Sequence, residues 1–148
     1  MTHSNSSDAE LRDLLRSAGT IAMVGASSKP DRPSNGVMRT LLDAGFRVIP
    51  VSPSETEVHG QRAYPSLGSI SEPVDIVDVF RKPEATPDVA ADAVKAGARV
   101  LWLQEGIVNQ EAARRGRAGG LVVVMDRCLG RTVTRLGIRG PAAVRPDR

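Results

Sequence analysis

The sequence has 148 residues, 41% of them hydrophobic, with 20 Lys and Arg against 17 Asp and Glu. This length suits one domain of ordinary size, and the hydrophobic share with mixed charge argues against disorder. No apolar run approaches the roughly 20 residues that span a bilayer, and the polar first nine residues lack the apolar core of a secretory signal. The net charge of +3 permits anionic ligands without requiring nucleic acid, and the single cysteine fits a cytoplasmic protein.

The first expected element is a short helix that follows a polar leader. Ser7 and Glu10 match a capping box, and three leucines at helical spacing supply an apolar stripe. We expect the leader and this helix to occupy residues 1–19, ahead of the first strand.

Five strand-length runs rich in Val or Ile follow along the chain. Several are apolar without alternation, as is typical of parallel strands that are covered on both faces. The runs are residues 21–25, 46–51, 74–80, 99–103 and 121–125.

Three helical patterns lie between these strands. The first covers residues 35–44, the second has Thr86 as its N-cap and ends at Gly97, and the third begins at Asn109 and ends at Gly119. Strands that alternate with helices predict an α/β fold, a single Rossmann-like doubly wound domain with a mainly parallel sheet of about five strands.

Two segments show no firm period. Residues 52–71 are punctuated by Pro and Gly, and we expect one short turn or strand near Tyr64. The domain is expected to span residues 20–128. The Arg-, Gly- and Pro-containing tail, residues 129–148, is expected to be partly disordered or to lie over the surface.

In an open parallel sheet, ligands bind beyond the carboxyl ends of the strands. The first strand is followed by residues 25–34, where small residues and a helix N-terminus favour phosphate. The hydroxyls of Ser27, Ser28 and Ser34 add donors, and Lys29 and Arg32 add positive charge. The alternative is an ordinary strand-to-helix turn with solvated charges.

Polar residues also follow the third, fourth and fifth strands. Arg81 and Lys82 could pair with a phosphate or form a solvated turn, and Gln104 and Glu105 face the same edge. Cys128 follows the fifth strand, where it is either a buried spectator or a reactive thiolate.

The dinucleotide fingerprint is incomplete. It requires three glycines after the first strand and an acidic residue at the end of the second. Here Gly25 is followed by Ala26, Ser27 and Ser28, and the second strand has no carboxylate until Glu55. NAD recognition is therefore poorly supported, and no Gly-Lys-Ser/Thr triplet indicates a P-loop.

Other chemistries find little support in the sequence. His3 and His59 form no metal-binding pattern with Cys128, so we expect no metal. Asp75 and Asp78 fall on opposite faces of one strand, which argues against a paired-carboxylate site. Trp102 is expected in the core, and the few aromatic residues argue against nucleic-acid binding.

Several separate motifs together resemble a known family. They are residues 24–34, 45–53, 64–67, 74–81 and 124–128. In the same order, they resemble the small stand-alone CoA-binding proteins, which are similar to the N-terminal domain of the succinyl-CoA synthetase α subunit. The resemblance covers about residues 20–128.

The resemblance implies a Rossmann-like domain that binds coenzyme A or an acyl-CoA across the strand ends. It implies that the loop of residues 25–34 holds the pyrophosphate, that Val51 and Pro53 flank the adenine, and that Gln104 and Glu105 lie toward the pantetheine. The full set of implied binding residues is Gly25, Ala26, Ser27, Ser28, Lys29, Arg32, Ser34, Val51, Pro53, Phe80, Arg81, Lys82, Gln104 and Glu105.

Two departures from the family limit what is implied. Ser54 stands where many relatives carry a Lys, so Arg62, Arg81 or Lys82 would have to hold the 3′-phosphate. The chain also has no room for the ligase and ATP-grasp parts of the synthetases. We therefore expect a binding module with no catalytic residue, serving as a homo-oligomer or with a partner enzyme. The alternatives are an NAD(P)- or other nucleotide-binding regulatory domain, and thiol or acyl-CoA chemistry through Cys128.

Overall fold

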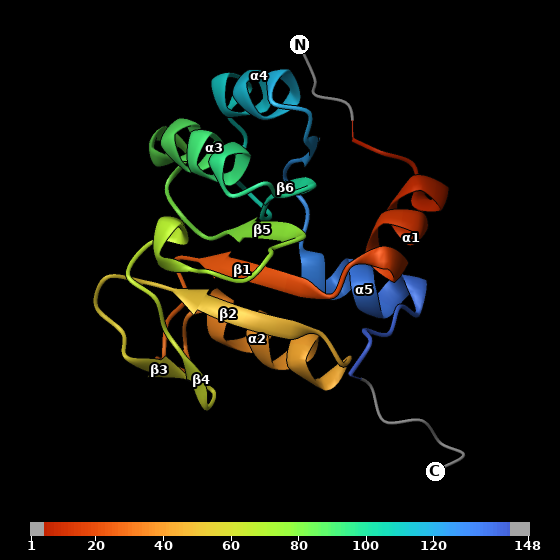
Figure 1. Cartoon of the computed structure of the whole chain (residues 1–148). Coiled ribbons are helices and arrows are strands. Elements are labelled where there is room, and N and C mark those ends of the chain that lie inside the picture. Colours follow the sequence, from red (N-terminus) through yellow and green to blue (C-terminus); the bar gives the residue numbers. More distant parts are fainter. Residues whose placement is uncertain (1–4, 143–148) are drawn as a thin grey trace.

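A parallel β-sheet forms the centre of the molecule in a computed structural model that describes residues 5–142 (Figure 1). Its strand order is β2-β1-β5-β6-β7, and every neighbouring pair is parallel. The strands are β1 (Thr20–Val24), β2 (Arg47–Val51), β5 (Ile76–Val79), β6 (Val100–Leu103) and β7 (Val122–Val124). The predicted α/β fold with a five-stranded sheet is confirmed.

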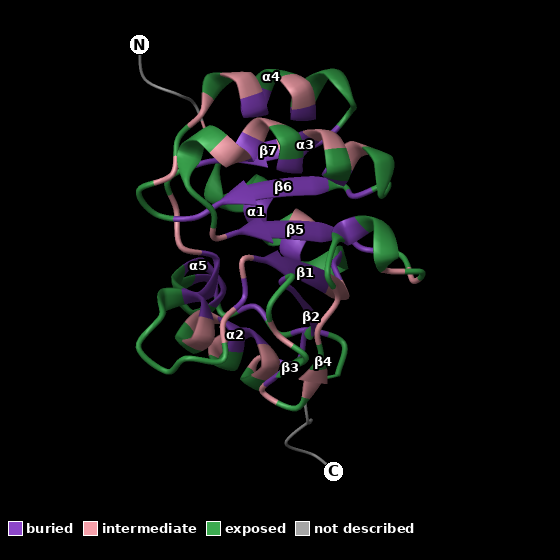
Figure 2. Cartoon of the chain, turned by 90° about the vertical axis from the view of Figure 1, so that its left-hand side faces the viewer, coloured by how far each residue is buried: buried purple, intermediate pink, exposed green. Residues whose placement is uncertain are grey.

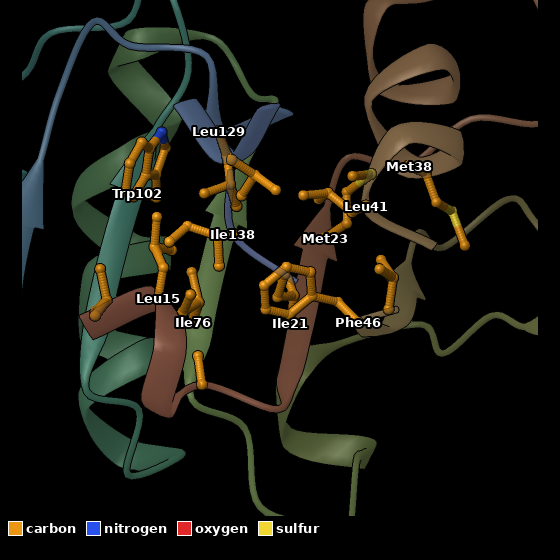
Figure 3. Packing of buried hydrophobic residues seen from close by; sticks show 14 of the residues in the cluster. Leu15, Ile21, Met23, Met38, Leu41, Phe46, Ile76, Trp102, Leu129 and Ile138 are labelled. Atoms are coloured by element: carbon orange, nitrogen blue, oxygen red, sulfur yellow. The ribbon is translucent and has the colours of Figure 1, made fainter. Parts of the chain in front are cut away.

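Helices cover both faces of the sheet, so the strands are buried between two layers (Figure 2). One layer holds α1 (Asp8–Ser17), α2 (Pro33–Asp43) and α5 (Leu129–Leu136), and the other holds α3 (Thr86–Lys95) and α4 (Gln110–Ala118). Alternate strand residues face the two layers, which explains the apolar runs without alternation. Figure 3 shows the first of the two cores, where Trp102 is fully buried as predicted.

The strand order changes direction beside β1. From β1 the chain crosses through α2 to β2 at one side, and then returns to β5 at the other side of β1. The crossovers through α3 and α4 then continue in the second direction. The carboxyl ends of β1 and β5 therefore flank the switch point, where a crevice opens in this class of sheet.

Most of the predicted elements are present, with boundaries shifted by one or two residues. The capping box of Ser7 and Glu10 begins α1, and Asn109 caps α4 through a hydrogen bond from the Ala112 amide. The α2 helix begins two residues earlier than predicted, at Pro33, and Thr86 is the first residue of α3 rather than its N-cap. No helix among residues 5–142 has the length and apolar character to cross a membrane.

The prediction for the segment after residue 129 is wrong where the structure describes it. Residues 129–136 form α5, whose Leu129, Val133 and Leu136 are buried against the first core. These three side chains recur at helical spacing, and together they cover the face of the sheet beside α2. Residues 137–142 continue along the protein, with Ile138 buried in the same core, and the last part of the predicted tail, residues 143–148, lies outside the described residues.

The long connection between β2 and β5 holds more structure than the single turn or strand predicted. A short hairpin of β3 (Glu57–Val58) and β4 (Gln61–Arg62) precedes Tyr64, which bridges to Val51 at the edge of the sheet. Two 3₁₀ turns, η1 (Leu67–Ser69) and η2 (Pro83–Ala85), stand before β5 and α3. Tyr64, which follows the hairpin, thereby pairs with the edge of β2 through hydrogen bonds with Pro50 and Ser52.

A side chain covers the opposite edge of the sheet. The Asn5 side-chain amide donates to the Met125 carbonyl oxygen at 2.8 Å, and its oxygen accepts from the Met125 amide at 2.9 Å. These two bonds, made one residue beyond the end of β7, imitate the pairing that a further strand would supply.

We expect Asn5→Ala to destabilise the fold by about 1–2 kcal/mol, because it removes two hydrogen bonds to partly buried backbone groups. Urea unfolding measures this loss. Ser6→Ala is the matched control, since Ser6 makes no side-chain hydrogen bond within residues 5–142, and an equal loss in both variants would contradict the role of Asn5.

Candidate functional site

A groove of about 1240 Å³ opens at the carboxyl edge of the sheet. Its floor is formed by the ends of β1, β5 and β6, and its walls are the N-terminal half of α2 and the outer face of α5. The volume exceeds that of most small-molecule sites, which hold about 300–1,000 Å³. An extended ligand with several groups therefore fits it.

Gly25 brings the loops after β1 and β5 into contact. Its φ is +90°, and a Cβ built on it would lie 2.2 Å from the Phe80 carbonyl oxygen. The Gly25 amide donates to the Val51 carbonyl oxygen at 3.0 Å, and the Phe80 amide donates to the Val24 carbonyl oxygen at 2.8 Å. Only glycine permits both the positive φ and this close approach of two backbones. The loop that carries the predicted phosphate-binding residues is therefore held directly against the Arg81 segment.

The N-terminus of α2 faces this groove without a side-chain cap. Pro33 is the first helical residue, Arg32 precedes it, and the first turn contains no acidic residue. Ser34 follows in that turn, is buried and lines the groove. The positive end of the helix dipole is therefore available to an anion.

A carboxylate of the chain itself occupies one donor of the loop. Glu55 Oε2 accepts from the Ser28 amide at 2.7 Å and from the Ser28 hydroxyl at 2.9 Å. The hydrogen bonds from the Ser28 amide and hydroxyl hold the pKa of Glu55 below its usual value. One backbone amide and one hydroxyl of the loop are therefore already bonded to a carboxylate of the chain itself.

Four cations at the groove are free of ion pairs within residues 5–142. Two come from the loop after β1 and two from the segment after β5: Lys29, Arg32, Arg81 and Lys82. The cations on the α5 wall differ, since Arg131 pairs with Glu105 at 3.0 Å and Arg135 pairs with Asp8 at 2.9 Å. Positive charge without an ion-pair partner within residues 5–142 therefore borders the switch point.

The floor of the groove contains a buried polar pair. Gln104 follows β6, lines the groove and is only 4% exposed, and its side-chain Nε2 donates to Asp78 Oδ1 of β5. Asp78 is fully buried. Complete burial raises the pKa of Asp78 to about 7, and the hydrogen bond from Gln104 offsets part of that rise.

The α5 wall was not anticipated as part of the site. Gly130 brings α5 against α2, because a Cβ at this position would lie 3.4 Å from Val37 Cγ1. Cys128, which precedes α5, is half-buried and lines the groove. Neither its position nor its exposure tests the thiol chemistry, which stays a prediction.

The structure brings most of the predicted binding residues to one groove. Eleven of them line it: Gly25, Ala26, Ser27, Lys29, Arg32, Ser34, Phe80, Arg81, Lys82, Gln104 and Glu105. Ser28, Val51 and Pro53 do not line the groove. Ser28 turns to Glu55, Val51 is buried in β2, and Pro53 is exposed beyond the strand end.

Other lining residues were missed by the sequence analysis. From α2 and the β2 end they are Pro33, Gly36, Val37, Thr40, Ser54 and Glu55, and from the β6 end and α5 they are Ile107, Gly130, Arg131, Thr134 and Arg135. The residues on α2 could have been expected, because this helix directly follows the predicted loop. The residues on α5 could not, because that helix was not predicted. Asp78 was also missed, although a carboxylate inside an apolar strand is itself an unusual signal.

No group of three or more His, Cys, Asp and Glu side chains within residues 5–142 could hold a metal ion. His59 Nε2 instead lies 2.9 Å from the Asn35 carbonyl oxygen at the base of α2. His3 lies outside the described residues.

The fold agrees with comparisons to known proteins. The family described as a CoA binding domain matches residues 19–134. The chain belongs to this CoA-binding family. The match extends through most of α5, beyond the boundary at residue 128 that the sequence motifs suggested.

Relatives of the CoA-binding family include both small proteins and parts of large enzymes. The chain is 42% identical over 125 residues to the uncharacterized protein YneT of Bacillus subtilis, covering 84% of this chain and 93% of that protein. It is similar to the solved structure of a hypothetical protein from Pyrococcus horikoshii, with 38% identity, a TM-score of 0.86 and coverage of 92% and 99%. It is also 28% identical over 90 residues to an ADP-forming acetate–CoA ligase of Archaeoglobus fulgidus, covering 60% of this chain and only 13% of the ligase.

Proposed function

We propose that the chain binds coenzyme A or an acyl-CoA along the groove, as a binding module without catalysis of its own. The observation that carries this proposal is the group of four cations, without an ion pair in the described part of the chain, beside a helix N-terminus that has no side-chain cap, in a chain of the CoA-binding family. A ligand with several phosphate charges matches such a site, because helix dipole, backbone amides and cations all act on one anion.

Different residues of the groove hold different parts of the ligand. The loop of residues 25–34 and the start of α2 hold the pyrophosphate, with Lys29 and Arg32 supplying charge. Arg81 and Lys82 hold the 3′-phosphate, because position 54, where many relatives carry a Lys, is a serine in this chain. The adenine lies toward the β2 end near Val51 and Pro53. The pantetheine arm then runs along the floor toward Gln104 and Glu105.

This assignment favours coenzyme A over NAD. In NAD-binding domains, the acidic residue after the second strand accepts from the ribose hydroxyls. Here the first carboxylate after β2 is Glu55, which is already bonded to Ser28. Coenzyme A supplies a thiol that carries acyl groups as thioesters, and the chain's own residues bind and orient it. The single cysteine suits the reducing cytoplasm that we infer as its compartment.

We expect Arg32→Ala and Arg81→Ala each to weaken CoA binding by about 1–3 kcal/mol, because each removes a charge-assisted contact to phosphate. Calorimetry on dialysed protein with CoA, dephospho-CoA and NAD measures this loss. If Arg81 contacts the 3′-phosphate, Arg81→Ala affects CoA more than dephospho-CoA.

Arg39→Ala provides the matched control on the same α2 helix. Arg39 pairs with Asp43 at 3.0 Å and does not line the groove, so its removal leaves CoA affinity unchanged. Unchanged affinity in both Arg32→Ala and Arg81→Ala would contradict the phosphate placement, and stronger binding of NAD than of CoA would overturn the proposed ligand.

A further inference from the structure

The pair of Gln104 and Asp78 connects the groove floor to the core. Asp78 lies in β5 between Met23 of β1 and Trp102 of β6, on the sheet face that α2 and α5 cover. Its Oδ1 accepts from Gln104 Nε2, and its Oδ2 is the one fully buried side-chain oxygen or nitrogen without a partner among residues 5–142. Burying a carboxyl with one oxygen left without a partner costs free energy of folding, so its presence calls for a role at this position.

The contact determines which end of the Gln104 amide faces the groove. A glutamine amide has one donor end and one acceptor end. Because Nε2 is directed to Asp78, the remaining end is Oε1, and the hydrogen bond to Asp78 is the only one that this side chain makes within residues 5–142. The groove floor therefore presents a hydrogen-bond acceptor at the carboxyl end of β6.

We propose that Asp78 is a positioning residue, whose buried carboxyl holds the Gln104 amide so that Oε1 accepts from an amide N–H of the pantetheine arm. This inference rests on the proposed function, because pantetheine is the part of coenzyme A that carries amide N–H groups. Asp78 itself does not line the groove and acts only through Gln104.

Protonation of Asp78 reverses this arrangement. The ionised carboxylate accepts from Nε2, whereas a neutral carboxyl donates its proton to Oε1 and turns the Nε2 end toward the groove. Burial raises the pKa of Asp78 to about 7, so both forms exist near neutral pH. The floor then presents an acceptor above this pH and a donor below it.

Charges on the elements packed around Asp78 do not contribute to this shift, because burial and Gln104 are its only causes. Strands β1 and β6 contain no charged residue. The Cys128 thiol precedes α5 and is half-buried. The charged side chains of the three covering helices are exposed: Asp8, Glu10, Arg12, Asp13 and Arg16 on α1, Arg39 and Asp43 on α2, and Arg131 and Arg135 on α5.

The test compares CoA with 3′-phospho-ADP, which is its nucleotide part without pantetheine. In calorimetry at pH 8, we expect Asp78→Leu and Gln104→Leu each to weaken CoA binding about fivefold to tenfold while leaving 3′-phospho-ADP binding unchanged. The double variant is no weaker than Gln104→Leu alone, because Asp78 acts through Gln104. Equal losses for both ligands, or additive losses in the double variant, would overturn the assignment.

The pH profile gives a readout that a merely structural role would not move. The ratio of CoA affinity to 3′-phospho-ADP affinity is measured from pH 8 to pH 6 in the wild type and in Asp78→Asn, which cannot ionise and also serves if the Leu variant fails to fold. The ligand phosphates titrate identically with both proteins, including the terminal phosphate that only 3′-phospho-ADP carries, so their contribution cancels when the two proteins are compared. We expect the ratio in the wild type, relative to that in Asp78→Asn, to fall as the pH is lowered. An equal pH dependence in the two proteins would overturn the inference, whereas a wild type that binds no CoA would instead contradict the proposed function.

Discussion

Gly25→Ala is expected to destabilise the protein by about 3–5 kcal/mol, a large part of the total stability of a domain this size. Two effects combine at this position. The φ of +90° is unfavourable for any residue with a Cβ, and the new Cβ would lie 2.2 Å from the Phe80 carbonyl oxygen. This neighbour is backbone, held by the Phe80 amide's own bond to Val24 in β1, so it cannot turn aside as a side chain would.

Urea unfolding followed by the fluorescence of the buried Trp102 measures the effect. Gly36→Ala is the control, because Gly36 lies in α2 on the same groove and a Cβ there meets no atom of residues 5–142 within 4 Å. Alanine in a helix interior is favoured over glycine, so this variant gains about 0.5–1 kcal/mol. A loss below about 1 kcal/mol in Gly25→Ala would mean that the two loops separate easily.

The second large effect concerns Asp78 and the pH dependence of stability. Its pKa is about 7 in the folded chain, where burial opposes ionisation, against an ordinary value of 3.8. Well below pH 3.8 the carboxyl is protonated in both the folded and the unfolded state, so it does not change the free energy of unfolding. Between these values the unfolded chain releases the proton and the folded chain retains it, so stability falls as the pH rises and levels off above pH 7.

Asp78→Asn removes this titration while preserving the shape of the side chain. We expect the free energy of unfolding of the variant, relative to the wild type, to increase by on the order of 4 kcal/mol between pH 4 and pH 8, from a shift of about three pKa units. Glu111, whose pKa two arginines lower to about 2, titrates equally in both proteins and cancels in the difference. A difference that does not change with pH would show that Asp78 ionises freely in the folded state.

This cost bears on the role of the pair with Gln104. A carboxylate that destabilises the fold at neutral pH is typical of a functional position, because stability is commonly reduced where a site needs a particular group. Asp78→Asn is therefore expected to make the protein more stable at pH 8 and, at the same time, to remove the pH dependence of pantetheine recognition.

Local patterns in the sequence predicted much of the site as well as the fold. Gly25, the serine-rich loop and Arg81 follow predicted strands, and parallel strands place their carboxyl ends at one edge whatever the details of packing. The wall made by α5 was missed, although Leu129, Val133 and Leu136 have helical spacing. Gly130 and the uncapped start at Cys128 weaken the local signal, and packing against α2 stabilises the helix instead.

The sequence by itself thus determined the alternation of strands and helices, the parallel sheet and the edge at which the groove opens. Each of these follows from the spacing of apolar residues and from turn residues close by in the chain. The tertiary structure alone decided the contact of Glu55 with Ser28 and that of Gln104 with Asp78, which join residues 27 and 26 positions apart. Such pairs depend on which strands become neighbours and on what burial does to a charge, and no local pattern encodes either of these.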